Sequence, residues 1–471
     1  MSKARLSEKI GYGFGDMSSS MFWKIFSYYL PFFYSNVFGL SLAHAGTLVL
    51  VTKLYDAISD PVMGLIADRT RTRWGKYRPY LLWIAVPFAI AGILAFYTPQ
   101  TDNYTFKHIY AYVTYILMMT VYTAINVPYG AMLGVMTDDS REKSVFSSFR
   151  MFFAFIGSFI AMGAFEPLLR LRSSIMGTLP ESWTLSDSVP VDWTIALTVI
   201  GSICAILFIL SFLMTREHVT EAEMAGERVV AENTPEHKSS IKNDLKCLVC
   251  NAPWWLLLGG GVAILLFNCI RGGAAAYYFA DVLGTNAIYT LAAFLTVGEI
   301  SQLVGVVVTV PISERIGKKN TFIAVLALIT VLSVIVAFLP DNAAGMWTLM
   351  GIQVLICIAI GINSPLLWSM FADVADYSEH KNGSSSTGLI FSSSSMAQKF
   401  GAAFGSAIVL WVLMAVGYDN AKGAVQTQEA LSTIKALMSW IPAVASAVGV
   451  VIMMLYPLTD RKMREIREKH S

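Results

Sequence analysis

Histidine and cysteine are both scarce in this chain of 471 residues, which contains six histidines and five cysteines. The histidines lie in predicted loops or at the ends of apolar runs: His44, His108, His218, His237, His380 and His470. They form no general acid–base constellation, so the sequence argues against an enzyme and predicts no cofactor. The cysteines indicate no disulfide framework. Cys247 and Cys250 form a lone CxxC pair, which we interpret as two incidental thiols rather than a zinc site.

Charged residues are also rare. They make up 14% of the chain, against about 25% in soluble domains, and hydrophobic residues make up 55%. This balance predicts a polytopic membrane protein with the lipid bilayer as its partner. The formal net charge of +2 favours no nucleic-acid partner, and no obligate protein partner is evident. The segment from Met1 to Lys9 lacks the small-residue cleavage site of a secretory signal, so we expect the first span to remain in the mature protein.

Long apolar runs dominate what is present. A transmembrane helix needs about 20 mostly apolar residues. By that measure the chain contains twelve candidate spans, at about 11–36, 44–67, 79–98, 107–136, 144–169, 191–214, 253–282, 288–312, 320–339, 344–372, 385–416 and 431–456. Glycine and polar residues break up the first and seventh runs, which predicts helices that line a cavity rather than face lipid.

Basic residues are distributed unevenly among the loops. They cluster after spans two, four and eight and in the C-terminal tail, whereas the alternate loops contain few. Since cytoplasmic loops are enriched in Lys and Arg, the even-numbered connections and both termini are predicted to be cytoplasmic. We therefore expect a multi-pass protein of the inner (cytoplasmic) membrane.

The longest polar stretch divides the spans six and six. The predicted organisation is a bundle at 1–214, a cytoplasmic central loop at 215–251, and a second bundle with a tail at 252–471. A weak internal repeat supports this division. Trp74-Gly75-Lys76 has a counterpart in Ile316-Gly317-Lys318, and each follows the second span of its half. The sequence thus predicts an all-α membrane protein of twelve transmembrane helices in two pseudo-symmetric six-helix bundles, as in transporters with a midplane site.

Asp56 and Asp60 are the most informative pair. They lie four residues apart on one face of the second span, where charge is costly. Pro61 cannot donate to the carbonyl of Ala57, which leaves an oxygen beside the two acids. Two carboxylates and a carbonyl suit a small hard cation such as Na⁺, so these acids are candidate metal ligands or a proton relay. The alternative is a pair of structural salt bridges.

Other polar residues are predicted within spans. Asp16, Ser20 and Lys24 recur at intervals of four in the first span and are candidate substrate ligands, or Lys24 and Asp16 form a structural pair. Lys53 lies three residues before Asp56 and is expected to be a tuning or structural partner of that acid rather than a substrate ligand.

The second half has its own buried charges. Arg271 adjoins Gly272-Gly273, where a local break would expose backbone groups to a substrate. Glu299, in the eighth span, is expected to pair with Arg271 or Lys24 rather than to take a proton.

The loop after the second span has a different predicted role. Asp68, Arg69, Arg73 and Lys76 are expected to form an electrostatic latch between helices that changes with access, or simply a topogenic basic loop.

Several motifs together resemble one family. The residues Tyr55-Asp56-Ala57-Ile58-Ser59-Asp60-Pro61, followed by Ala67 to Pro79, resemble the glycoside–pentoside–hexuronide:cation symporters of the major facilitator superfamily. Gly11 to Asp16, Asn126 to Gly130 and Tyr456 to Asp460 also match, and the resemblance covers essentially the whole chain. It implies the major facilitator fold and import of a sugar with Na⁺ or H⁺.

The resemblance also implies roles for single residues. It places Asp56, Asp60 and Thr123 at the cation site with Lys399 beside it, and Arg150 at the sugar. Ser19-Ser20, Asn126 and Gly130 depart from the melibiose permease pattern, whereas Asn126 and Trp368 resemble the xyloside and glucuronide branch. Trp368 and Tyr122 are candidates for stacking on a sugar. The alternatives are an exporter, or a carrier of another metabolite or lipid-like substrate, in the same superfamily.

Overall fold

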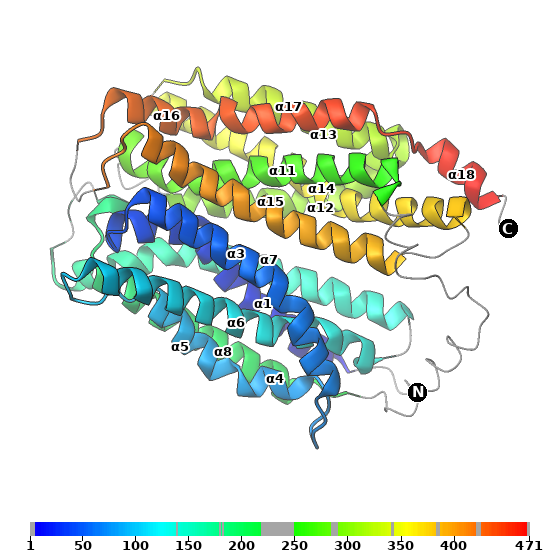
Figure 1. Cartoon of the computed structure of the whole chain (residues 1–471), viewed down its shortest axis with the longest axis horizontal. Coiled ribbons are helices and arrows are strands. Elements are labelled where there is room, and N and C mark those ends of the chain that lie inside the picture. Colours follow the sequence, from blue (N-terminus) through cyan, green and yellow to red (C-terminus); the bar gives the residue numbers. More distant parts are fainter. Residues whose placement is uncertain are drawn as a thin grey trace. The chain divides into compact units, whose positions relative to one another are not determined.

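The structure is a computed structural model that describes residues 5–137, 140–178, 180, 183–217, 249–283, 291–340, 343–382, 387–420 and 425–468. These residues are overwhelmingly helical (Figure 1). Within them, nine helices are long and apolar enough to cross a membrane. Three further segments, α1, α3 and the pair α4–α5, complete a set of twelve. Polar residues explain why α1 and α3 do not meet the same criterion, and these are the helices that carry most of the candidate site.

The chain forms two compact units. Unit 1 comprises Met1–Asn233 together with Phe279–Thr296 and Gly417–Gln426. Its helices are α1 (Leu6–Tyr28), α2 (Leu30–Phe32), η1 (Phe33–Val37), α3 (Leu42–Arg69), α4 (Arg78–Trp83), α5 (Ala85–Ala95), α6 (Tyr104–Met136), α7 (Ser140–Ile175), η2 (Leu185–Asp187) and α8 (Pro190–Met214).

Unit 2 comprises Thr234–Tyr278, Val297–Val416 and Thr427–Ser471. The helices of this second half of the sequence are α11 (Ala252–Tyr277), η3 (Tyr278–Val282), α12 (Leu291–Ile316), α13 (Lys318–Val336), α14 (Ala343–Asn382), α15 (Thr387–Ala415), α16 (Gln428–Met438), α17 (Trp440–Met454) and α18 (Asp460–Glu468). Nearly all of η3 and the first turn of α12 belong to unit 1.

Helix packing repeats between the units. In unit 1, α1 packs against α7 and α8, and α5 packs against α8. In unit 2, α11 packs against α15 and α17, and α13 packs against α17. These contacts join the first helix of each half to its fifth and sixth, and the third to its sixth. The packing therefore has the internal symmetry that the short sequence repeat indicates.

The local break that Gly272-Gly273 would permit beside Arg271 is not present. Helix α1 is continuous from Leu6 to Tyr28, and α11 runs through Gly272-Gly273 without a break. Helical glycine keeps its own backbone hydrogen bonds, so nothing forces the helix open there. The irregular backbone lies instead at the end of each span, in the π-helical turns η1 and η3. Backbone groups freed beside Arg271 are therefore not part of the site.

A matching turn connects the second and third spans of each half. Gly75 and Gly317 both have positive φ, at 115° and 85°, a conformation that favours glycine. The following backbone N–H groups bind a carboxylate from just beyond the last span of the same half. That carboxylate belongs to Glu217 in unit 1 and to Asp460 in unit 2. The two short motifs of the sequence repeat thus adopt the same structure.

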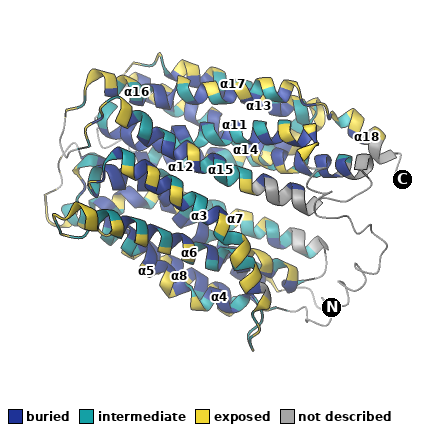
Figure 2. Cartoon of the chain, viewed as in Figure 1, coloured by how far each residue is buried: buried dark blue, intermediate teal, exposed yellow. Residues whose placement is uncertain are grey.

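Burial follows the helix contacts rather than polarity (Figure 2). On α3, Ile58 and Leu65 are 66% and 62% exposed, whereas Asp56 on the same helix is only 4% exposed. An apolar outer face and a buried acid are the reverse of the pattern in a soluble protein. Helix α3 therefore presents its carboxylates to the interior of unit 1.

Candidate functional site

Asp56 and Asp60 on α3 meet Thr123 on α6, which packs against α3. The Thr123 Oγ1 lies 3.0 Å from Asp56 Oδ1 and 3.2 Å from Asp60 Oδ1. The Ser59 hydroxyl is 3.3 Å from the same Thr123 oxygen and also donates to the Asp56 carbonyl at 3.0 Å. Helical spacing explains the arrangement, because residues 56, 59 and 60 share one face of α3. The two acids thus converge on one hydroxyl.

One hydroxyl in this cluster, that of Thr123, lies within hydrogen-bond distance of both carboxylates. A threonine hydroxyl has one proton and donates it to one carboxylate at a time. The other carboxylate oxygen then faces the Thr123 oxygen across about the same distance. The two carboxylates and the Thr123 and Ser59 hydroxyls supply four closely spaced oxygens, which suit a hard cation such as Na⁺, and either carboxylate can carry a proton. These residues could therefore hold either coupling ion.

Asp16 on α1 is paired with Arg150 on α7. The guanidinium donates from Nε to Asp16 Oδ2 at 3.0 Å and from Nη2 to Oδ1 at 3.4 Å. It also lies over the ring of Tyr129, 5.3 Å from its centroid. The Tyr129 hydroxyl donates to the Tyr12 carbonyl at 2.6 Å, which fixes the ring. This forked pair was not anticipated from sequence, where Asp16 was considered with Lys24.

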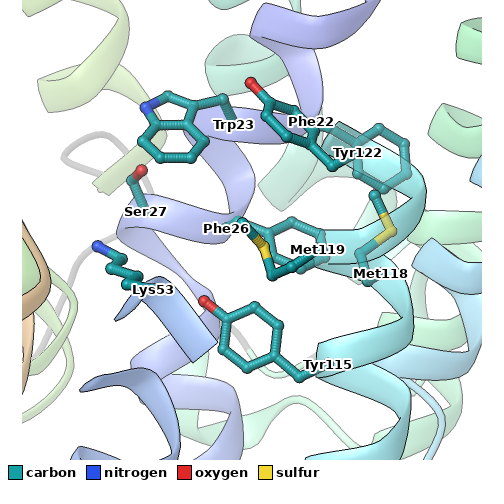
Figure 3. Close-up of a pocket in the computed structure, with 9 residues that line it drawn as sticks. All are labelled: Phe22, Trp23, Phe26, Ser27, Lys53, Tyr115, Met118, Met119 and Tyr122. Carbon is teal, nitrogen blue, oxygen red and sulfur yellow. The ribbon is translucent and has the colours of Figure 1, made fainter. Parts of the chain in front are cut away.

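A pocket opens between α1, α3 and α6 (Figure 3). It is lined by Phe22, Trp23, Phe26, Ser27, Lys53, Tyr115, Met118, Met119 and Tyr122. The Trp23 and Tyr122 rings lie 5.7 Å apart at 31°. The polar ends of Ser27, Lys53 and Tyr115 lie on one side of the pocket, with thioethers and rings beyond them. The free volume is about 20 Å³, enough for a water rather than a sugar ring, so these rings and polar groups can contact a sugar only if the pocket widens.

The face of α1 that lines this pocket differs from the predicted one. Trp23 and Ser27 line it, whereas the Lys24 ammonium lies 5.8 Å from the centroid of its own neighbour, Tyr28. A helix has 3.6 residues per turn, so residues at successive intervals of four move steadily around its axis. The face that carries Asp16 therefore continues through Trp23 and Ser27, seven and eleven residues later. Counting by 3.6 instead of by fours finds Trp23 and Ser27 from sequence. Ser20 is half-buried on the same helix.

Asn126 and Tyr122 are connected on α6. The Asn126 amide donates to the Tyr122 carbonyl at 3.1 Å, one turn earlier. This places the amide on the face of α6 that carries Thr123 and Tyr122. Lys53, predicted as a partner of Asp56, lies on α3 within the aromatic pocket.

The candidates of the second half lie in unit 2. Arg271 on α11 is buried and donates to the side-chain oxygen of Gln353 on α14, a partner that sequence reasoning missed. Glu299 on α12 is buried, and its neighbour Gly298 approaches Gln353 and Cys357. Trp368 is 38% exposed, with its ring 5.9 Å from that of Phe371. Lys399 is half-buried on α15, and its approach to Asp56 stays a prediction.

The predicted loop latch is only partly described. Arg69 and Arg73 are exposed, and Arg73 lies over the Trp74 ring at 4.7 Å. The Asp68 side chain lies outside the described residues. The Lys76 backbone N–H donates to Glu217 at 2.8 Å, so an acid from the central loop takes part in holding this turn.

Comparison with known proteins finds a family of sugar transporters and relatives named as glycoside carriers. The family model described as "MFS/sugar transport protein" matches residues 11–460. The putative glycoside/cation symporter YagG of Escherichia coli K12 is 35% identical over 99% of this chain and 95% of its own. The isoprimeverose transporter of Lactiplantibacillus pentosus is 30% identical, covering 99% and 92%. The glucuronide carrier protein homolog of E. coli K12 is 29% identical, covering 97% and 93%.

Solved structures resemble the fold. A bacterial homolog of the lysosomal transporter Spinster, inward-facing and unoccupied, gives a TM-score of 0.66 at 13% identity, covering 98% of this chain and 97% of its own. The nucleoside transporter NupG gives 0.62 at 12% identity, covering 95% and 98%. Together with the family match, this confirms the predicted all-α fold of twelve membrane helices.

Proposed function

This chain belongs to the MFS/sugar transport protein family, and on that premise we propose that it imports a sugar or glycoside together with Na⁺ or H⁺ by alternating access. The family is one of transporters and not of enzymes. The single observation that carries the proposal is the convergence of Asp56, Asp60 and Thr123 within unit 1. Two carboxylates and two hydroxyl oxygens gathered between membrane helices are ligands suited to Na⁺ or to a transported proton.

The sugar site is proposed next to the ion site. The Arg150 fork and the ring pair of Trp23 and Tyr122 supply the two elements that a hydroxylated ring needs, forked donors and an apolar face. Both lie in unit 1 with the acids. The names of the relatives favour a xyloside or glucuronide-like glycoside as the substrate class. Asp16, Ser20, Lys24 and Asn126 are proposed to complete the site, with Arg271 and Trp368 contributed by the second half.

The proposed cycle couples the two sites. A cation entering from outside neutralises Asp56 and Asp60, releases Lys399 from pairing with them, and orders the sugar site. Fully loaded and empty carriers then exchange between inward-open and outward-open states, whereas half-loaded carriers do not. One charge crossing 100 mV supplies about 2.3 kcal/mol. That is enough for about a fifty-fold accumulation of sugar per cation.

The proposed location is the inner membrane with both termini cytoplasmic. The basic turn from Arg69 to Arg78 then lies inside, and the ends of α1 and α7 near residues 29–41 and 176–189 lie outside. The arrangement agrees with the positive-inside rule and with import driven by the membrane potential.

The test is counterflow by the full chain in proteoliposomes. A panel of xylosides, glucuronides, galactosides and free pentoses is assayed with and without Na⁺, at two pH values. We expect one glycoside class to exchange, with a half-saturating concentration that falls when Na⁺ or acid is added. Exchange of apolar or lipid-like compounds, with no glycoside exchanged, would contradict the proposal and favour an exporter or lipid carrier.

A further inference from the structure

An open pocket lies at the end of unit 1 where α6 and α8 begin. Its volume is about 580 Å³, within the range of about 300–1,000 Å³ that is typical of small-molecule sites. The segment that connects α5 to α6 forms one wall, and the end of η1 and the first turns of α6 and α8 form the others. None of the described residues that line this pocket belongs to the candidate ion or sugar site.

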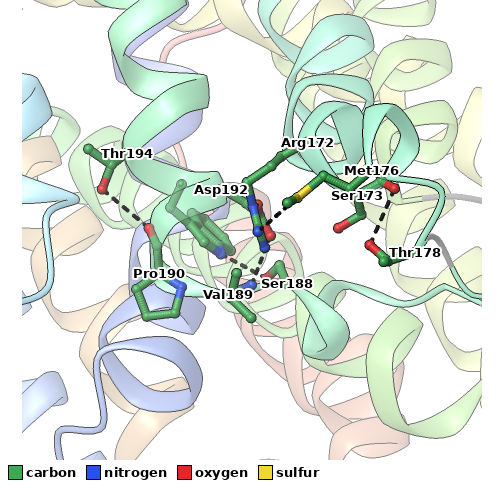
Figure 4. Close-up of polar contacts among 10 residues, drawn as sticks. Arg172, Ser173, Met176, Thr178, Ser188, Val189, Pro190, Asp192 and Thr194 are labelled. Carbon is green, nitrogen blue, oxygen red and sulfur yellow. Dashed lines mark hydrogen bonds and ion pairs between the residues drawn. The ribbon is translucent and has the colours of Figure 1, made fainter.

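The walls of the pocket are held by hydrogen bonds within unit 1. The Thr194 hydroxyl, in the first turns of α8, lies 3.2 Å from the Pro190 carbonyl (Figure 4) and 3.3 Å from the Phe96 carbonyl at the end of α5. Asn103 caps the start of α6, where its side chain accepts from the Phe106 N–H at 3.1 Å. The pocket is therefore formed in advance, which lowers the ordering cost of binding a ligand.

Lys107 and Asp102 bring charges of both signs to the lining of this pocket. Lys107 is half-buried in α6, and Asp102 is exposed just before that helix. Among the residues that the structure describes, neither side chain makes an ion pair or a hydrogen bond. A partly desolvated charge is stabilised by a partner of opposite sign. Two such charges on one lining suit a ligand that carries both an anion and a cation.

Lys107 is also exceptional for its end of the molecule. Under the proposed orientation this end is external, where Lys and Arg are few. Arg170 and Arg172, on α7, each have an acid of unit 1 within reach, Glu166 at 3.7 Å and Asp192 at 2.7 Å. Lys107 has no such acid within the described part of the chain. An anion from outside the chain is the partner that its position calls for.

An apolar stripe leads away from the pocket along α8. Val191 lines the pocket and is 49% exposed. Val199, Ile203 and Ile206 lie further along the same face of α8 and are 37–56% exposed (Figure 2). Exposed apolar side chains on a membrane-spanning helix contact acyl chains. The pocket therefore joins a site with both signs of charge to a surface that faces lipid.

We propose that this pocket binds the headgroup of a phospholipid that carries a primary ammonium, with phosphatidylethanolamine as the simplest example. Lys107 binds the phosphate, Asp102 accepts hydrogen bonds from the ammonium, and an acyl chain follows the stripe from Val191 to Ile206. The inference goes beyond the proposed transport function. It uses the proposed orientation only to assign the lipid to the outer leaflet.

The test measures which phospholipids the full chain retains. Protein purified in detergent is equilibrated with an equimolar mixture of phosphatidylethanolamine, phosphatidylcholine and phosphatidylglycerol, and the bound lipids are counted by native mass spectrometry. The choline headgroup has no N–H donor and the glycerol headgroup has no cation. We therefore expect the parent to retain phosphatidylethanolamine about ten-fold more than either, the effect of one charge-assisted hydrogen bond.

The two charged residues should fail in different ways. Asp102→Asn should bring phosphatidylethanolamine retention down to that of phosphatidylcholine. Lys107→Gln should lower the retention of all three lipids about ten-fold, and Lys107→Arg should restore it, because arginine also binds phosphate. The matched controls are Glu429→Gln and Arg461→Gln, which remove exposed charges from unit 2 and should keep the parent pattern.

Equal retention of the three lipids by the parent would overturn the proposal, as would parent-like retention in both pocket variants or equal losses in the controls. If one pocket variant is not monodisperse, the other decides. Soluble glycerophosphoethanolamine separates a lipid from a free phosphate ester, since displacement of phosphatidylethanolamine at equal concentration would show that the acyl chains contribute nothing. The assay needs no glycoside. Selective lipid retention by a chain without glycoside counterflow would contradict the proposed function and leave the lipid site intact.

Discussion

Glu217 caps the start of α4, and Arg78, the first residue of α4, caps the end of α8. The Glu217 carboxylate accepts hydrogen bonds from the backbone N–H groups of Lys76, Tyr77 and Arg78 at 2.7–2.8 Å, at the start of α4. The Arg78 side chain in turn donates to the Phe212 carbonyl at 2.8 Å, near the end of α8. Burial and the neighbouring Arg216 lower the pKa of Arg78, whereas Glu217 opposes that shift. An anion at one helix start and a cation at another helix end are each favourable.

The second half repeats this exchange with different residues. Asp460 accepts from the Lys318 N–H at 2.8 Å, while the Lys319 ammonium donates to the Met454 and Tyr456 carbonyls at 3.0 and 2.5 Å. The end of the sixth helix is thereby fixed to the start of the third in each bundle. The central loop and the C-terminal tail both begin at such a cap.

Removing either cap should loosen its own bundle. Glu217→Ala and Asp460→Ala are each expected to cost about 1–2 kcal/mol, because buried backbone donors lose a charged acceptor. The measurement is the midpoint of thermal unfolding in detergent, which should fall by a few degrees. The matched control is Glu465→Ala, which removes only an exposed pair with Arg461. An unchanged midpoint in both cap variants would show that the caps contribute nothing.

The Thr123 hydroxyl should determine cation affinity. Thr123→Ala removes a hydroxyl donor that lies between Asp56 and Asp60 and is expected to raise the half-activating cation concentration about ten-fold, the effect of about 1.4 kcal/mol. Thr123→Ser keeps the hydroxyl and should remain near the parent value. Cation activation of counterflow at saturating glycoside gives both numbers. If serine and alanine behave alike, the hydroxyl is not a ligand.

How far the sequence predicts this site depends on which partners share a helix. Asp56 and Asp60 are recognisable because four residues make one turn, and the internal repeat indicates two bundles. Asp16 and Arg150, or Arg271 and Gln353, lie on different helices, and only the packing of α1 against α7 or α11 against α14 brings them together. In the sequence, Glu217 is one of several acids in the predicted central loop at 215–251, and nothing distinguishes it from the others. Its role appears only when the turn at Gly75 aligns three N–H groups toward it.

Arg150 should act through its fork rather than its charge alone. Arg150→Lys keeps the charge but cannot bind Asp16 through two donors, so we expect at least about a ten-fold loss of glycoside affinity. Cation activation should change little by comparison. Glycoside binding measured calorimetrically on the purified carrier tests this. The control is Arg172→Lys, an arginine of the same helix that pairs with Asp192 away from the site, and full affinity in Arg150→Lys would contradict the assignment.

Trp23 should contribute an apolar face to the substrate. Trp23→Ala is expected to weaken glycoside binding about ten-fold or more and Trp23→Phe to weaken it less, since a smaller ring keeps part of the stacking. Trp83→Ala is the matched control, because that indole is exposed on α4. Inhibition of counterflow by unlabelled glycoside measures the three affinities. Equal affinities in the Trp23 and Trp83 variants would remove the pocket from the proposed site.

The most direct test of the coupling claim is uphill accumulation by Asp60→Asn. Proteoliposomes with an imposed cation gradient and an inside-negative potential are loaded with trace labelled glycoside, beside parent protein and the control Asp187→Asn. Asp187 caps the short helix η2 through Thr184. We predict that Asp60→Asn loses concentrative uptake while the control accumulates as the parent does. Undiminished uphill uptake by Asp60→Asn would contradict the assignment of Asp56, Asp60 and Thr123 as the coupling site.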